Sequence, residues 1–182
     1  EKYAVSAFQL HVSGYLLKPI TPEAVQKEID HIKGVKATEK LLNIKCFGNF
    51  EVFHNGEILH FKRKKTKELL AVLIDRNGAG MTAKQICAVL FPDVTYDAKN
   101  ATYLRQLVLD LKNTLKNIQA EDVFQHDTPY YRIDTNLVRC DYLSFLETGK
   151  PEFYGEYMTQ YSWAEETCAM LQFKKLQKDS RM

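Results

Sequence analysis

The sequence predicts an α+β fold in which short antiparallel strands flank three consecutive helices. Residues 98–119 form the longest pattern, because apolar side chains recur there at alternating steps of three and four along one helical face. These side chains are Ala101, Leu104, Val108, Leu111, Leu115 and Ile118. A shorter helical pattern covers residues 82–90, and β-rich runs at 123–125 and 130–133 form a hairpin signal. Helix, helix and hairpin in this order predict a winged helix-turn-helix.

A small antiparallel sheet is expected before these helices. Residues 44–53 alternate between the two faces expected of a strand, with apolar residues prominent on one side. Asn55-Gly56 is a strong signal for a tight hairpin turn, and residues 58–61 supply the returning strand. The domain is therefore expected to open with a sheet.

Two shorter helices should connect this sheet to the long helix. The first is expected over residues 66–77, with Gly78 as a left-handed stop. The second covers residues 82–90, with Thr82 as its N-cap. A short connection then leads to the long helix, which would enter the major groove of DNA as the second member of a helix-turn-helix.

Positive charge is concentrated on the predicted helices. Residues 61–119 hold eleven Lys and Arg against five Asp and Glu, a net charge of +6. Residues 1–60 hold seven of each sign, and residues 120–182 hold seven basic and eleven acidic residues. The basic run at 62–67 stands at a predicted helix start, where the macrodipole disfavours cations. This distribution is typical of a nucleic-acid footprint, although a solvated helix start is the alternative.

The polar face of the long helix supplies candidate contacts to DNA. The side chains expected to face the groove are Lys99, Thr102, Tyr103, Arg105, Gln106 and Asn113. The expected phosphate contacts are Lys64, Lys65 and Lys112. At the hairpin tip, His126 or Thr128 would touch the adjacent backbone or minor groove. Taken alone, the helix is better described as an ordinary amphipathic helix whose polar face meets only water, and its place in a predicted helix-turn-helix with a hairpin is what favours contacts to DNA.

Other chemistries have weak support in the sequence. The four cysteines form no Cys-x-x-Cys pair and no Cys/His cluster with zinc spacing. There is no phosphate-binding loop, no nucleophile motif and no stretch of transmembrane length. We therefore expect no catalytic residue, no metal site, no cofactor and no membrane partner, in a cytoplasmic protein.

The N-terminal residues predict a helix, a strand and a second helix, over 1–10, 12–17 and 21–32. The run YAVSAFQLHVSGYLLKPITPEAVQKEI resembles the end of a response-regulator receiver domain. Lys18, before a proline, matches that family's phosphoryl-contacting lysine, and Tyr15 matches its aromatic switch position. The resemblance implies a partial α/β receiver that forms a homodimer. It also implies a sensor histidine kinase for the full-length parent. Because the family's phosphoacceptor aspartate lies in earlier strands, we expect a fragment that cannot be phosphorylated there.

The central residues resemble the OmpR/PhoB-type winged helix, and within it the SARP-type branch. The resemblance spans residues 43–147 and is carried by FGNFEVFHNGEI, KELLAVLIDRNG, VLFPD, YLRQLVLDLKNTL and PYYRIDTNLVRCDYLSFLE. Asp110 departs from it, since many relatives place a basic residue there. After residue 151, YGEYMTQYSWAEETCAMLQFKKLQ resembles the start of the bacterial transcriptional activator domain. The alternative there is a terminal amphipathic helix packed through Trp163, Met170 and Leu171.

These patterns and resemblances predict four segments. Residues 1–33 would end a receiver domain, 34–43 would form a linker, 44–147 a winged-helix DNA-binding domain, and 148–182 the start of a helical activator domain. The predicted function is a DNA-binding transcription regulator of a two-component system, with double-stranded DNA as its partner. The alternative is a protein-interaction adaptor whose winged helix no longer binds DNA. An enzyme is the weakest reading.

Overall fold

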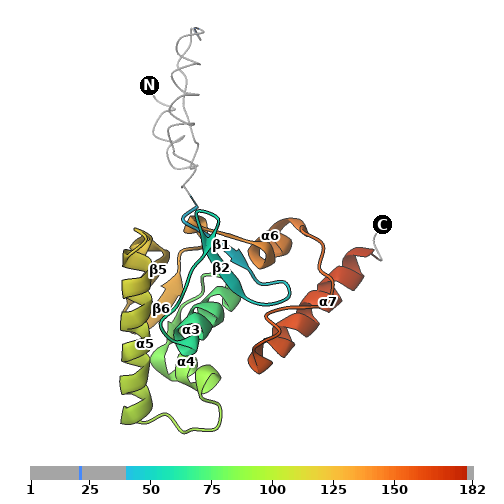
Figure 1. The fold of residues 1–182 in the computed structure, drawn as a ribbon. Coiled ribbons are helices and arrows are strands. Elements are labelled where there is room, and N and C mark those ends of the chain that lie inside the picture. Colours follow the sequence, from blue (N-terminus) through green and yellow to red (C-terminus); the bar gives the residue numbers. More distant parts are fainter. Residues whose placement is uncertain (1–20, 22–39, 180–182) are drawn as a thin grey trace, which may run out of the picture. The chain divides into compact units, whose positions relative to one another are not determined.

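The computed structural model describes residue 21 and residues 40–179. Tyr15, Lys18 and the helix-strand-helix predicted around them lie outside the described residues. The chain divides after Glu39 into two units, and the second, Lys40–Met182, has a mixed α+β fold (Figure 1). Its first strand begins at Leu42, inside the segment predicted as a linker. The predicted division into four segments stays a prediction.

Seven strands and five α-helices build the part of the second unit that the structure describes. The strands are β1 (Leu42–Lys45), β2 (Glu51–His54), β3 (Glu57–Ile58), β4 (Met81–Thr82), β5 (Phe124–Asp127), β6 (Tyr130–Ile133) and β7 (Val138–Cys140). The helices are α3 (Lys64–Asp75), α4 (Ala83–Leu90), α5 (Ala98–Lys116), α6 (Asp141–Thr148) and α7 (Glu165–Asp179). Within these described residues, no helix combines the length and the apolar character needed to cross a bilayer.

The first sheet has the strand order β3-β2-β1-β7. β1 pairs antiparallel with β2 and parallel with β7, so that Ile44 stands between Val52 and Cys140. The prediction of one continuous strand over residues 44–53 was wrong. The chain reverses between β1 and β2, where Gly48 adopts a φ of 78° that favours glycine. Alternation alone did not distinguish one strand from two strands around a tight turn.

The hairpin predicted at Asn55-Gly56 is confirmed. Both residues have positive φ, 50° and 85°, and they connect β2 to β3. Positive φ at both central positions is what a two-residue turn of this kind requires, and Asn-Gly tolerates it best. The returning strand is shorter than predicted, because β3 ends at Ile58.

The second sheet has the order β4-β6-β5. β5 and β6 pair antiparallel, with Phe124 opposite Ile133 and Asp127 opposite Tyr130, which confirms the predicted hairpin. β4 adds to the outer side of β6 and was not predicted, because two residues carry no periodicity. This sheet therefore ties the start of α4 to the hairpin that follows α5.

The start of α4 agrees with the sequence prediction. The Thr82 hydroxyl accepts a hydrogen bond from the Gln85 amide, and the Gln85 side chain accepts one from the Thr82 amide. This reciprocal arrangement is a capping box, which satisfies amides that have no partner inside the helix. The N-terminus of α4 is thereby fixed by Gln85 and by Thr82, which is the last residue of β4 in the second sheet.

Helices α3, α4 and α5 share one apolar core with the first sheet. The buried side chains of α5 are Leu104, Leu107, Val108, Leu111 and Leu115. Leu107 was missing from the predicted stripe, whereas Ala101 and Ile118 at its ends are only partly buried. α3 begins two residues before and ends two residues before the predicted span, at Lys64 and Asp75. The prediction thus found most of the buried face of α5, and the two ends of α3 differ from it by two residues each.

The segment after α6 packs into the same core. Phe153 has no exposed surface, and its ring centroid lies 5.0 Å from that of Phe47 and 6.0 Å from that of Phe145. The Gln160 side chain accepts from the Phe50 amide and donates to the Phe50 carbonyl. The residues between α6 and α7 thus cover the turn between β1 and β2.

The last helix packs less completely than predicted. Leu171 is fully buried and Trp163, just before α7, is half-buried. Met170, predicted to pack, is 46% exposed, and Phe173 is 69% exposed. Helical spacing could not identify the inward side, because α7 carries apolar residues on more than one face.

A partly buried carboxyl group at the end of α3, that of Asp75, links this helix to the C-terminal segment. The Tyr157 hydroxyl donates to Asp75 Oδ1 over 2.9 Å, and the Tyr142 hydroxyl donates to the Asp75 carbonyl. Burial raises the pKa of Asp75 above its ordinary value of 3.8, although the hydroxyl groups of Thr167 and Tyr157 oppose this shift. The folded chain therefore holds this proton more tightly than the unfolded chain.

A prediction about pH follows from this raised pKa. The contribution of Asp75 to stability should fall as pH rises from about 4, since the unfolded chain loses the Asp75 proton first. Asp75→Asn removes the ionisation while keeping an oxygen for Tyr157, so the loss between pH 4 and 7 should become smaller. Urea unfolding at several pH values measures the effect, with Asp93→Asn, an exposed position, as the control. An unchanged pH dependence in Asp75→Asn would contradict the prediction.

Candidate nucleic-acid interface

The long helix α5 lies at one side of the described unit, as Figure 1 shows for the yellow helix. Its start is fixed by Asp97, whose carboxylate accepts a hydrogen bond from the Asn100 amide over 2.8 Å. One turn on, the Thr102 hydroxyl donates to the Ala98 carbonyl. The inner stripe of leucines holds the helix against α3 and α4, so its opposite face is free to meet solvent.

This outer face collects most of the residues predicted to contact DNA. The exposed side chains from one end of α5 to the other include Lys99, Thr102, Arg105, Gln106, Leu109, Lys112, Asn113 and Lys116. Tyr103 is the exception among the predicted groove contacts. It is half-buried, with its ring centroid 5.6 Å from that of Phe91. Tyr103 therefore packs between α4 and α5 more than it projects from the helix.

The charge of this face is positive along its length. Lys99, Arg105, Lys112 and Lys116 are all exposed. Asp110 is the acidic residue of α5, and its carboxylate forms an ion pair with Arg63 just before α3. Only 14% of the Asp110 side chain is exposed. The negative charge of Asp110, the position that departs from the sequence resemblance, is thus neutralised by Arg63.

Two of the three lysines predicted to hold phosphates, Lys64 and Lys65, stand in different surroundings. Lys64 is exposed at the first position of α3. Lys65 Nζ donates to the Leu90 carbonyl over 2.9 Å and pairs with Glu68 at 2.8 Å. It also lies 5.6 Å from the centroid of the Phe91 ring. Because Lys65 already uses most of its hydrogen-bonding capacity inside the protein, Lys64 is the better candidate for a phosphate contact.

The β5–β6 hairpin continues the surface formed by α5. Lys112 Nζ lies 5.8 Å from the centroid of the Phe124 ring, at the start of β5. Near the hairpin tip, the His126 ring stacks on Tyr131 with centroids 4.1 Å apart. His126 and Thr128 are both exposed, as predicted. The helix and hairpin therefore present neighbouring polar surfaces that two parts of one duplex can contact.

Sequence reasoning missed one residue in the middle of this face. Leu109 is 58% exposed and lies between Gln106 and Lys112 along the helix. A leucine outside the apolar stripe of an amphipathic helix was the available signal. Within a polar DNA-reading face, an exposed aliphatic group can contact the methyl group of thymine.

The likeness of this chain to known proteins lies in its fold. No protein-family model matches the chain, and no curated protein matches its sequence. Among solved structures, the chain is similar to EmbR of Mycobacterium tuberculosis, solved in complex with a low affinity phosphopeptide. The TM-score is 0.61 at 16% sequence identity, over 76% of this chain and 43% of that chain. The two proteins share a fold, and this chain matches less than half the length of EmbR.

Proposed function

We propose that this chain is a DNA-binding transcription regulator in which α5 enters the major groove and the β5–β6 hairpin is the wing. The observation that carries the proposal is the outer face of α5. Four cations are exposed there, while Asp110 is paired with Arg63. A helix that is anchored by a leucine stripe and presents amides, hydroxyls and cations has the chemistry of a recognition helix.

The proposed contacts divide by chemistry. Arg105 would donate two hydrogen bonds to a guanine, and Gln106 would pair with an adenine edge. Lys64 and Lys112 would bind phosphate groups, which supply affinity without sequence preference. At the wing, His126 would approach the neighbouring backbone or minor groove.

The finer assignment is a SARP-type regulator of a two-component system. The likeness of the fold to EmbR supports a SARP-like domain, as does the sequence resemblance over residues 43–147. Tyr15 and Lys18 support the place in a two-component system, with a homodimer and a sensor histidine kinase for the parent protein. In this proposal the chain is a binding protein without catalytic residues.

The alternative is an adaptor that binds another protein. It is favoured by α7, where Met170, Phe173 and Leu176 are 46%, 69% and 62% exposed. An adaptor would use this apolar surface and would bind duplex DNA weakly or not at all. The two proposals are therefore distinguished by DNA binding itself.

Binding should be measured by fluorescence anisotropy, with duplexes selected from a random pool and with unselected duplex. The two phosphate contacts proposed for Lys64 and Lys112 would make the logarithm of the binding constant fall with a slope of about −2 against the logarithm of salt concentration. Selected duplex should bind more tightly than unselected duplex. Absent binding, or binding that does not respond to salt, would exclude the proposal in favour of the adaptor.

Replacing Lys64 with glutamine tests the phosphate contact at the start of α3. The variant should weaken binding to all duplexes alike and reduce the salt slope by about 1, because one fewer counterion is released. Lys150→Gln changes an exposed lysine outside α3 and α5 and should leave the slope unchanged. Equal slopes in the parent and Lys64→Gln would show that this lysine does not meet phosphate.

A further inference from the structure

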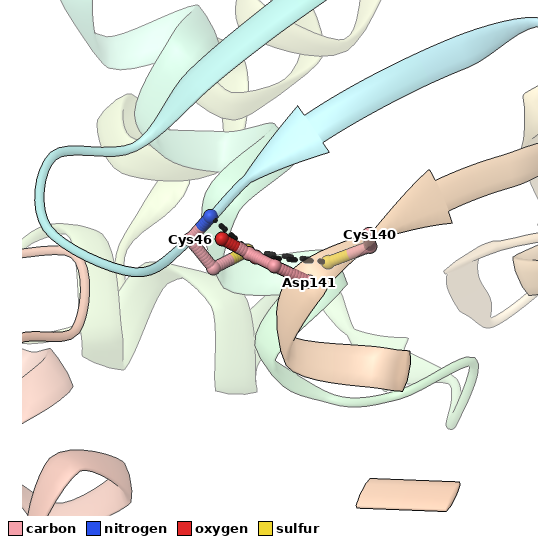
Figure 2. A group of neighbouring side chains, drawn as sticks. All are labelled: Cys46, Cys140 and Asp141. Atoms are coloured by element: carbon pink, nitrogen blue, oxygen red, sulfur yellow. Dashed lines mark hydrogen bonds between the residues drawn. The ribbon is translucent and has the colours of Figure 1, made fainter. Parts of the chain in front are cut away.

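Two cysteines from distant parts of the chain lie next to each other where the neighbouring strands β1 and β7 end. Cys46 directly follows β1 and Cys140 ends β7, and their Sγ atoms lie 3.4 Å apart (Figure 2). The exposed fractions of the two residues are 0% and 2%. Cys87 and Cys168 have other surroundings, with thiols that donate to the carbonyls of Asn100 and Gly155. The chain's four cysteines thus include one closely spaced pair.

Asp141 completes the cluster and holds the backbone on which Cys46 stands. Its Oδ1 accepts from the amides of Cys46 and Tyr142 over 2.8 Å and 2.7 Å, and its Oδ2 accepts from the Phe47 amide over 3.0 Å. These bonds fix the position of Cys46 relative to β7.

The hydrogen bonds of Asp141 also bear on whether this cluster binds a metal ion or undergoes redox chemistry. The sulfur atoms and a carboxylate oxygen lie within 4.8 Å of one another, as three metal ligands can. However, backbone amides occupy both lone pairs of Asp141 Oδ1 and one lone pair of Oδ2. The two thiols and Oδ2 are at most three ligands, whereas a closed structural zinc site has four protein ligands. The surroundings therefore favour chemistry between the two sulfur atoms.

An open groove lies next to this pair, and because Cys140 is only 2% exposed, a small molecule held there reaches its thiol when the end of β7 opens locally. The groove has a volume of about 390 Å³, and its lining includes Cys140 and Asp141. Lys45 and Arg139 also line it, so its charge favours an anionic reagent. Oxidised glutathione carries carboxylates and an exchangeable disulfide, which makes it a suitable probe.

We propose that Cys46 and Cys140 are a redox modification site, which forms a reversible disulfide by exchange with a small anionic disulfide. The Cys140 thiolate attacks one sulfur of the reagent, and the other half leaves as a thiolate that takes up the proton lost by Cys140. Cys46 then loses its proton, attacks Cys140 Sγ and releases the second half, which takes up that proton. Two protein thiols are oxidised and one reagent disulfide is reduced to two thiols. This site is independent of the proposed DNA binding.

The order of attack follows from the position of each cysteine relative to the groove. Cys140 lines the groove and Cys46 does not. Burial, together with the neighbouring Cys140, raises the pKa of the Cys46 thiol, so Cys46 is a poor first nucleophile. Cys140 is therefore the entry point and Cys46 resolves the mixed disulfide.

The test exposes the folded chain to oxidised glutathione, removes the reagent, unfolds the chain in denaturant, blocks free thiols with an alkylating reagent and measures intact mass. The reduced chain takes up four alkyl groups, one for each cysteine. The oxidised chain should take up two, and peptide mapping without reductant should join Cys46 to Cys140. Because the bond closes a loop between positions 94 residues apart, the thermal midpoint should rise by roughly 5–10 °C.

Matched variants separate this site from general thiol oxidation. Cys87→Ala/Cys168→Ala should still lose both remaining free thiols, and Cys46→Ala should stop at a glutathione adduct on Cys140. Cys140→Ala should leave Cys46 unmodified in the folded chain. The proposal is overturned if all four thiols stay alkylatable, or if mapping joins a different pair. It is also overturned if the chain retains one zinc ion after dialysis in a manner that requires both cysteines.

Discussion

Replacing Phe153 with alanine is expected to lower the free energy of unfolding by about 3–5 kcal/mol. Phe153 is fully buried and its ring packs on Phe47 and Phe145. The substitution removes most of this contact and leaves a cavity under the first sheet. Urea unfolding followed by circular dichroism measures the loss, and the thermal midpoint should fall by about 10 °C.

Tyr154→Ala is the matched control for this prediction, since the neighbouring tyrosine is 79% exposed. It should change the free energy of unfolding by less than about 1 kcal/mol. Both variants should unfold in one transition, because Phe153 shares the core of the first sheet. If Phe153→Ala unfolded residues 150–177 in a separate step and left the main transition unchanged, that segment would be energetically independent.

Removing Arg105 or Gln106 should have the largest effect on DNA recognition. Each change to alanine is expected to weaken binding to the selected duplex by about 1–3 kcal/mol, or roughly fivefold to 150-fold. Both side chains are exposed on the outer face of α5. Binding to unselected duplex should fall much less for Gln106→Ala, because this side chain carries no charge.

The controls for this experiment match residue type. Arg139→Ala changes an exposed arginine on β7, and Gln172→Ala changes an exposed glutamine on α7. Neither should alter the preference for the selected duplex. If the α5 variants keep the parent's affinity and selectivity, α5 is not the reading helix and the proposed function fails.

Local patterns predicted the elements that are stabilised by local chemistry. Thr82 and Gln85 form the capping box of α4 from residues three positions apart. Asn55-Gly56 makes its turn because few other pairs tolerate two positive φ angles. In these cases the physical cause lies within a few residues, so the sequence alone was sufficient.

Long-range contacts were not predictable in the same way. Arg63 lies just before α3 and Asp110 lies in α5, and no spacing in the sequence indicated that they pair. β7 is three residues long and is paired with β1, so its partner lies almost a hundred positions earlier. Helical periodicity predicted which residues form the candidate DNA-reading face of α5. The net charge of that face, however, depends on the ion pair between Arg63 and Asp110.

The parallel pairing of β1 with β7 also has a consequence for the order of folding. β1 is an inner strand of its sheet only when β7 is in place, because the strand order is β3-β2-β1-β7. A ribosome must therefore synthesise residue 140 before one edge of β1 is covered. Until then β1 exposes unpaired backbone groups, which are a template for association between nascent chains. We expect chains truncated before Val138 to aggregate, and the closing of this sheet to be a late, slow event in folding.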